Sequence, residues 1–176
     1  MPEQYRDLIN IFNDTFSACT NTRLIKGGDE PLYSPADDVC EYHQIIFAHG
    51  FYASALHEIA HWCLAGPARR LKEDFGYWYT PDGRDQIQQE QFEQVEIKPQ
   101  AIEWALSVST GKCFDVSIDN LSGMGTTDRI AFKRAVYQQV IHYLNSGFPN
   151  DAQKFIVALA NFYQTPLPLT RTHFVL

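Results

Sequence analysis

The chain has 176 residues and a formal net charge of −7, and 45% of its residues are hydrophobic. This composition is ordinary for a globular protein, and the length is enough for one sizeable core, so we expect a single domain over residues 1–176. The acidic balance argues against a nonspecific nucleic-acid coat, and no apolar stretch is long enough to cross a membrane. The chain starts without the pattern of a secretory signal and its four cysteines are scattered, so we expect a reduced, cytoplasmic protein.

The first third of the chain is predicted to hold two helices and two short strands. Residues 3–17 place apolar side chains on one helical stripe, which is typical of a packing helix. Residues 21–41 are rich in Gly, Pro and Asp and indicate an irregular connection with one short strand at 22–25. The apolar run at 45–48 suits a buried strand, and the helix predicted over 52–65 ends at Gly-Pro.

The middle of the chain is predicted to form an aromatic strand at 75–79, closed by a turn at 81–83. Asp85 followed by Gln88 resembles a capping pair for a helix that runs to about residue 108. Pro99 lies inside that helix and removes one backbone hydrogen bond, so we expect the helix to kink or restart there.

The last third is predicted to be mainly helical. A short strand is expected at 116–118, and helices are expected at 127–145 and 151–163. The segment 165–168 contains two prolines and cannot continue a helix. Several helices with a few short strands indicate an α+β fold, mainly helical.

The sequence His57-Glu58-Ile59-Ala60-His61 carries the most informative chemistry. Residues four apart lie on the same helix face, so both imidazoles can reach one ion. This is the His-Glu-x-x-His pattern of metal sites, in which the glutamate can handle protons. The simpler interpretation is two half-buried histidines, one of them paired with Glu58.

A metal site needs a third protein ligand, and the next helix offers four glutamates as candidates: Glu90, Glu93, Glu96 and Glu103. We favour Glu96, because it has apolar neighbours on both sides and lies one turn before Pro99. The ion would then lie between two helices, as in the helix pair of a zincin. His49, just before the motif helix, is a further residue that could lie nearby.

Three interpretations compete for such a site. Zinc would make a hydrolase, with Glu58 as the general base. Fe(II) held by two histidines and one carboxylate would leave positions open for O₂ and make an oxygenase. A closed structural site is less favoured because such sites prefer four ligands and thiolates, and Cys63 is rotated away from His61. The residues alone leave the first two interpretations open.

Several long stretches resemble the elongation factor P hydroxylase family. They are the runs at 21–27, 49–63, 75–79, 81–85 and 95–101. The resemblance covers nearly the whole chain, without departures at the motif positions, and weakens after Asn145.

The resemblance implies a cytoplasmic bacterial enzyme that hydroxylates the conserved lysine of translation elongation factor P after a β-lysyl group has been attached. It implies His57, His61 and Glu96 as metal ligands, and we hypothesise a catalytic role for Glu58. The implied reaction is O₂ activation at a non-haem metal, with Fe(II) as the expected ion. The electron donor is open, and 2-oxoglutarate is not assumed because the motif differs from the His-x-Asp…His order of common 2-oxoglutarate oxygenases.

No substrate-binding residue is assigned, but the cationic substrate suggests acids and aromatics near the metal. The candidates are Asp82, Asp85, Glu93, Tyr77, Trp78 and Tyr79. Each also has a structural interpretation, as a turn, cap, surface or strand residue. The alternative functions are a zinc metallopeptidase and a non-catalytic metal-binding protein.

Overall fold

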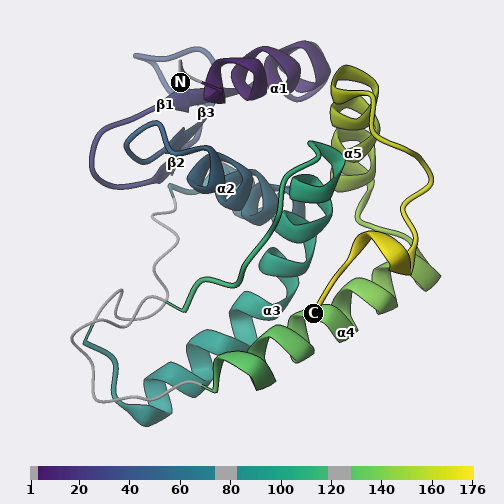
Figure 1. The fold of residues 1–176 in the computed structure, drawn as a ribbon. Helices are drawn as coiled ribbons and strands as arrows, with labels where there is room; N and C mark the ends of the chain where they lie inside the picture. The colour runs from purple at the N-terminus through teal and green to yellow at the C-terminus, as the bar shows by residue number, and fades with distance from the viewer. Residues whose placement is uncertain (1–3, 74–82, 119–127) are drawn as a thin grey trace.

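The computed structural model describes residues 4–73, 83–118 and 128–176. Its helices are α1 (Tyr5–Thr20), α2 (Tyr52–Leu64), α3 (Gln86–Ser109), α4 (Arg129–Ser146) and α5 (Asn150–Tyr163). Its strands are β1 (Thr22–Lys26), β2 (Leu32–Ser34) and β3 (His43–Phe47), and two short 3-10 helices span Arg69–Leu71 and Arg171–His173. The sheet and α1 lie at one end of the molecule, and α4 lies at the other (Figure 1). The expected α+β class, mainly helical with a few short strands, is confirmed.

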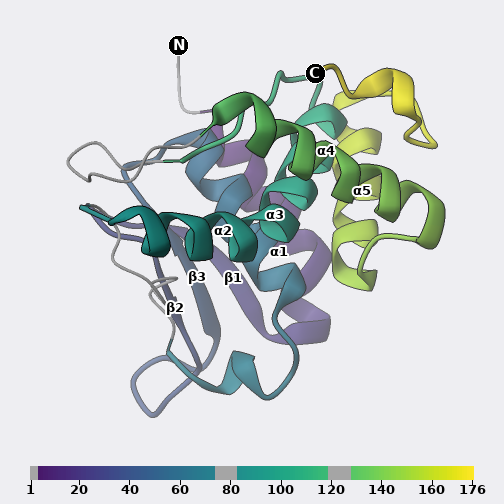
Figure 2. The same ribbon diagram turned by 90° about the horizontal axis from the view of Figure 1, so that it is seen from below.

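The small sheet has the strand order β1-β3-β2. β1 and β3 are parallel, with Leu24 opposite Ile45, and β2 pairs antiparallel with β3. α1 and α2 pack against the sheet (Figure 2), where Leu24, Ile45 and Phe47 are buried. The sequence did not predict β2, because it is a three-residue edge strand between Pro31 and Pro35 and has little periodicity to read.

An aromatic cluster joins three helices in the core. Phe12 and Phe16 of α1 meet Trp62 of α2, with ring centroids 5.3 and 4.9 Å apart. Phe155 of α5 contacts Phe12 at 5.5 Å. These edge-on contacts add to the stability that burial of the rings provides. The apolar stripe predicted for the first helix is therefore its core face.

α3 is the central helix and packs against α2, α4 and α5. It begins at the predicted cap, where the Asp85 side chain accepts from the Gln88 N–H and the Gln88 side chain accepts from the Asp85 N–H. Of the two expectations at Pro99, a kink or a restart, the restart is wrong, because the helix continues through Pro99 to Ser109. A proline removes only one helical hydrogen bond, and the buried packing of the following turns holds the helix together.

The strand expected at 116–118 is also wrong, since residues 112–118 form no regular element. The Gln100 side chain donates to the Ser117 carbonyl at 2.7 Å and accepts from the Ser117 N–H at 3.0 Å. A side-chain amide on α3 thus takes the place that a neighbouring strand would have, and the backbone polar groups are satisfied without a sheet.

The other predicted elements that fall on described residues agree with the structure to within a few residues. α4 and α5 match the helices expected at 127–145 and 151–163, and the segment 165–168 is non-helical. The predicted aromatic strand at 75–79 and most of the turn at 81–83 lie outside the described residues. Among the described helices, none is both long and apolar enough to cross a bilayer.

Candidate metal centre

α2 places His57 and His61 one turn apart on the side that faces α3. The chain enters α2 through a turn in which His49 and Gly50 take left-handed φ angles of 54° and 72°. The Ser54 hydroxyl accepts from the Ala48 N–H and ties this turn to the first turn of the helix. The opposite side of α2 is buried in the core, so packing fixes the rotation of the helix and the direction of both imidazoles.

Glu96 of α3 lies next to the two imidazoles. The Nε2 atoms of His57 and His61 are 3.1 Å apart. The Glu96 carboxylate lies 3.1 Å from His61 Nε2 and 3.6 Å from His57 Nε2. Glu96 is 1% exposed, whereas both histidine side chains keep about a quarter of their surface in solvent. The Glu96 carboxylate therefore lies on the buried side of the cluster, and the two imidazoles lie on the side that solvent can reach.

The separations of these donor atoms fit a single ion. Ligands about 2.1 Å from one ion lie about 3.0 Å apart at a right angle and about 3.4 Å apart at the tetrahedral angle. The observed separations of 3.1–3.6 Å between the three side chains match this range. Two imidazole nitrogens and one carboxylate also form the donor set of facial non-haem sites and of catalytic zinc sites. The described residues of the cluster can therefore hold a divalent metal.

Charges inside the centre shift the pKa values of its members. Burial alone would lower the pKa of His57, but the Glu96 and Glu103 carboxylates outweigh burial and raise it to about 10. Burial alone would raise the pKa of Glu96, but the two histidines outweigh burial and lower it to about 2. At neutral pH we therefore expect the His57 imidazole to be protonated when no metal is bound, and a cation that binds this imidazole has to displace a proton.

Glu58, the second residue of the motif, is half-buried and does not belong to the ligand cluster. Burial raises the pKa of its carboxyl, against the lowering effect of the two histidines. Among the described residues it has no hydrogen-bond partner. Glu58 is therefore a carboxylic acid next to the cluster, and no hydrogen bond to another described side chain restricts its use as a proton donor or acceptor.

Two further residues of α3 contact members of the cluster. Glu103 Oε2 lies 2.8 Å from His57 Nδ1, on the side of the ring away from the cluster. Gln100 donates to Glu96 Oε2 at 3.3 Å. Glu103 was one of the four predicted ligand candidates and instead contacts His57, a member of the cluster. Gln100 was not predicted, although its place four residues after Glu96 was the signal that could have found it.

The other candidates lie away from the cluster. Glu90 is exposed, and Glu93 accepts a hydrogen bond from Gln89. His49 Nδ1 lies 3.7 Å from Asp29 and takes no part in the centre. The acids and aromatics at 77–82 that were suggested for substrate binding lie outside the described residues.

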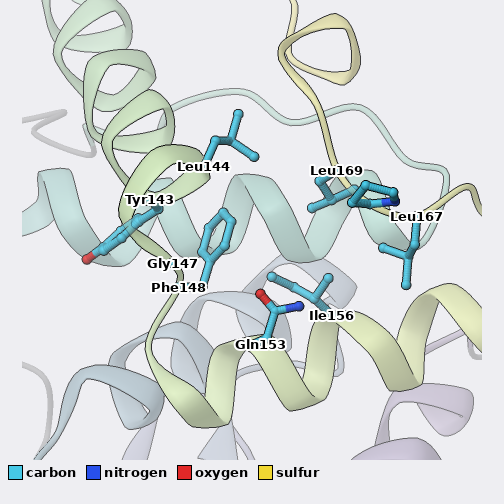
Figure 3. Close-up of a pocket in the computed structure, with 9 residues that line it drawn as sticks. Tyr143, Leu144, Gly147, Phe148, Gln153, Ile156, Leu167 and Leu169 are labelled. Atoms are coloured by element: carbon cyan, nitrogen blue, oxygen red, sulfur yellow. The ribbon is translucent and has the colours of Figure 1, made fainter.

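A separate pocket of about 410 Å³ lies between the end of α4, α5 and the C-terminal segment. Figure 3 shows Phe148, Ile156 and Leu169 around this space. His57, His61 and Glu96 do not line it, so this pocket is not the approach to the metal centre.

Comparison with known proteins identifies the family. The family model described as elongation factor P hydroxylase matches residues 11–174. The chain belongs to the elongation factor P hydroxylase family. It is 53% identical over 165 residues to a protein of Haemophilus influenzae named elongation factor P lysine hydroxylase, covering 94% of this chain and 92% of that relative.

The family match confirms the resemblance predicted from the sequence. In this member of the elongation factor P hydroxylase family the matched residues 11–174 include the whole His/His/Glu cluster and both helices that carry it. The cluster therefore belongs to the part of the chain shared with the family.

Proposed function

We propose that this chain, acting as a single domain over residues 1–176, hydroxylates the β-lysylated lysine of translation elongation factor P. The observation that carries the proposal is the cluster of His57, His61 and Glu96 in a chain whose relative is named for hydroxylation of a lysine of that factor. The partner is the factor itself, without direct contact with nucleic acid or membrane, and the compartment is the cytoplasm, where translation takes place.

The proposed metal is Fe(II), with the two histidine Nε2 atoms and the Glu96 carboxylate as ligands. This donor set leaves coordination positions open, which an oxygenase needs. All four cysteines are free thiols and none joins the cluster, so nothing favours a closed thiolate site. Bound Fe(II) would supply O₂ activation, in which one oxygen atom would enter a C–H bond of the lysine and the other would become water with two electrons and two protons from a separate reductant.

The charges of the centre suit a cationic substrate. Two buried carboxylates, Glu96 and Glu103, balance the charge of a divalent ion, so the ion does not repel an ammonium group. Glu58 adds a third acid at the half-exposed edge. A β-lysyl side chain would therefore approach a centre that is neutral to negative.

Glu58 is the proposed catalytic acid or base, because it lies beside the ligands without being one. We expect Glu58→Gln to slow hydroxylation by about 10²–10⁴-fold while the bound metal is retained. Turnover and metal content measured on the same preparation test this, with Glu90→Gln, an exposed acid on α3, as the control. Loss of metal from Glu58→Gln would contradict the catalytic role.

The proposed reaction is tested by intact-mass analysis of β-lysylated elongation factor P. The factor is incubated with this protein, Fe(II), a reductant and air. We expect a gain of one oxygen atom that is absent with His57→Ala. No gain by a protein with metal demonstrably bound would contradict the proposal and favour a zinc peptidase with Glu58 as the general base, to be tested on peptide substrates.

A further inference from the structure

Glu103 is a buried carboxylate that the cluster of ligands does not use. It is 7% exposed, on the most buried stretch of α3 and between the core residues Ile102 and Trp104. In the part of the chain that the structure describes, it forms no ion pair with a lysine or an arginine. A buried charge without such a partner is costly, so the packing of the fold gives no reason for an acid at this position.

The contact that Glu103 does make is directed at one atom. Its Oε2 lies 2.8 Å from Nδ1 of His57, which is a short, charge-assisted hydrogen bond. The other ring nitrogen, Nε2, lies 3.1 Å from His61 Nε2 and 3.6 Å from the Glu96 carboxylate. The two nitrogens of one imidazole therefore have separate partners, Glu103 on one side and the cluster on the other.

This geometry excludes Glu103 as a fourth ligand of an ion held by the Nε2 atoms. The ligand cluster contains His57, His61 and Glu96 and leaves Glu103 out. A histidine that binds a metal through Nε2 carries its proton on Nδ1, and a carboxylate that accepts this proton fixes the tautomer and the orientation of the ring. The spacing agrees, since Glu96 and Glu103 are two turns apart on one face of α3.

We infer that Glu103 is a positioning residue, whose hydrogen bond to Nδ1 holds His57 in the tautomer and orientation that present Nε2 to the metal. The inference rests on the proposed metal centre and goes beyond it, because it assigns a role to a residue outside the ligand set. α3 then has two roles: Glu96 is a ligand on the buried side of the centre, and Glu103 orients the ligand His57 on α2.

Metal affinity of the whole chain, measured without any elongation factor, tests the inference. Zn²⁺ is the probe, in competition with a chromophoric chelator, and the proteins are the natural chain, Glu103→Gln, Glu103→Asp and the control Glu90→Gln. We expect Glu103→Gln to weaken Zn²⁺ binding about 10- to 100-fold, Glu103→Asp to regain part of the affinity, and Glu90→Gln to change nothing. Circular dichroism establishes that each variant is folded.

The visible spectrum of bound Co²⁺ provides a readout that a purely structural role would not change. The spectrum of Glu103→Gln should differ from that of the natural chain, because a reoriented imidazole changes the ligand field, and that of Glu90→Gln should not. Natural affinity and an unchanged Co²⁺ spectrum in Glu103→Gln would overturn the inference and leave the metal centre standing. A natural chain that binds neither ion would overturn the metal centre itself, and the hydroxylase proposal with it.

Discussion

Glu96 is a buried carboxylate that accepts a hydrogen bond from Gln100 and lies within 3.6 Å of the imidazoles of His57 and His61. Burying an ionised carboxylate is expensive unless cations or hydrogen bonds compensate for the lost water. The two histidines compensate in the metal-free protein, and a divalent ion would do so more strongly. The proposed metal site would therefore account for this residue better than packing does.

We expect Glu96→Ala to lose the bound metal and keep the fold. The change removes one of the three proposed ligands, and it replaces a charged side chain rather than an apolar one, so we expect the helices to keep their packing. Metal content after dialysis and the circular dichroism spectrum measure the two effects, with Glu90→Ala as the control. Natural metal content in Glu96→Ala would remove this residue from the set of ligands.

The raised pKa of His57 predicts how stability depends on pH. Its folded pKa of about 10 lies above the usual 6.5, so its ion pairs stabilise the metal-free protein fully below pH 6.5 and are lost as the pH rises toward 10. The lowered pKa of Glu96 has the opposite sign, and its contribution is present above pH 4.5 and lost as the pH falls toward 2.

We therefore expect the melting temperature of the metal-free protein to fall from pH 6.5 toward pH 10. The increase in melting temperature caused by added Zn²⁺ should grow over the same range, because a smaller fraction of His57 carries a proton that Zn²⁺ has to displace. Thermal unfolding with and without Zn²⁺ checks both trends, and His57→Gln should flatten them. A Zn²⁺ effect that shrinks with rising pH would contradict this description of the centre.

At the scale of elements, α3 carries most of the side chains that contact the two histidines and the segment 112–118. Glu96, Gln100 and Glu103 follow one another at spacings of four and three, so they lie on one helix face. That face meets α2 through Glu96 and Glu103, and it meets the segment 112–118 through Gln100. The rotation of α3 about its own axis therefore determines two things: which of its side chains reach the two histidines of α2, and where the segment 112–118 can pack.

Gln100→Leu is expected to destabilise the protein by about 2 kcal/mol, because it leaves the N–H and carbonyl of Ser117 without their side-chain partner. Urea unfolding measures the loss, with Gln94→Leu at an exposed position of α3 as the matched control. Hydrogen exchange should quicken at Ser117. An unchanged urea midpoint would mean that the segment 112–118 holds its path without Gln100.

At the scale of the whole molecule, the candidate metal centre and the aromatic core share α2. His61 is followed at once by Trp62, which is 3% exposed and packs against Phe12 and Phe16 of α1. Adjacent residues on a helix point in different directions, so one helix can serve the core and the centre at the same time. The core therefore holds the ligand-bearing helix in its orientation.

Phe155→Ala is expected to cost about 3–5 kcal/mol of unfolding free energy, since it empties a fully buried ring position in contact with Phe12 and Phe16. Chemical denaturation measures this. The control is Phe162→Ala on the same helix, a residue that is 54% exposed, and it should change stability by no more than about 0.5 kcal/mol. Equal losses in the two variants would contradict the description of the core.

The sequence by itself determined the features that depend on neighbours along the chain. The helices, the Asp85 cap and the pairing of His57 with His61 on one face follow from spacing within a single element. The family was also recognisable from long matching runs, and the comparisons confirm it.

The sequence favoured Glu96 as the third residue of the cluster, but only the tertiary structure brings it to the two histidines and places Glu103 against His57. Both acids have apolar neighbours in the sequence, and His57 is 46 positions away from Glu103, so the atoms that each acid contacts depend on how α2 and α3 pack. The strand wrongly expected at 116–118 has the same cause, because a distant glutamine satisfies its backbone. Local periodicity carries no information about the relative rotation of two helices, and the burial of both against a common core sets that rotation.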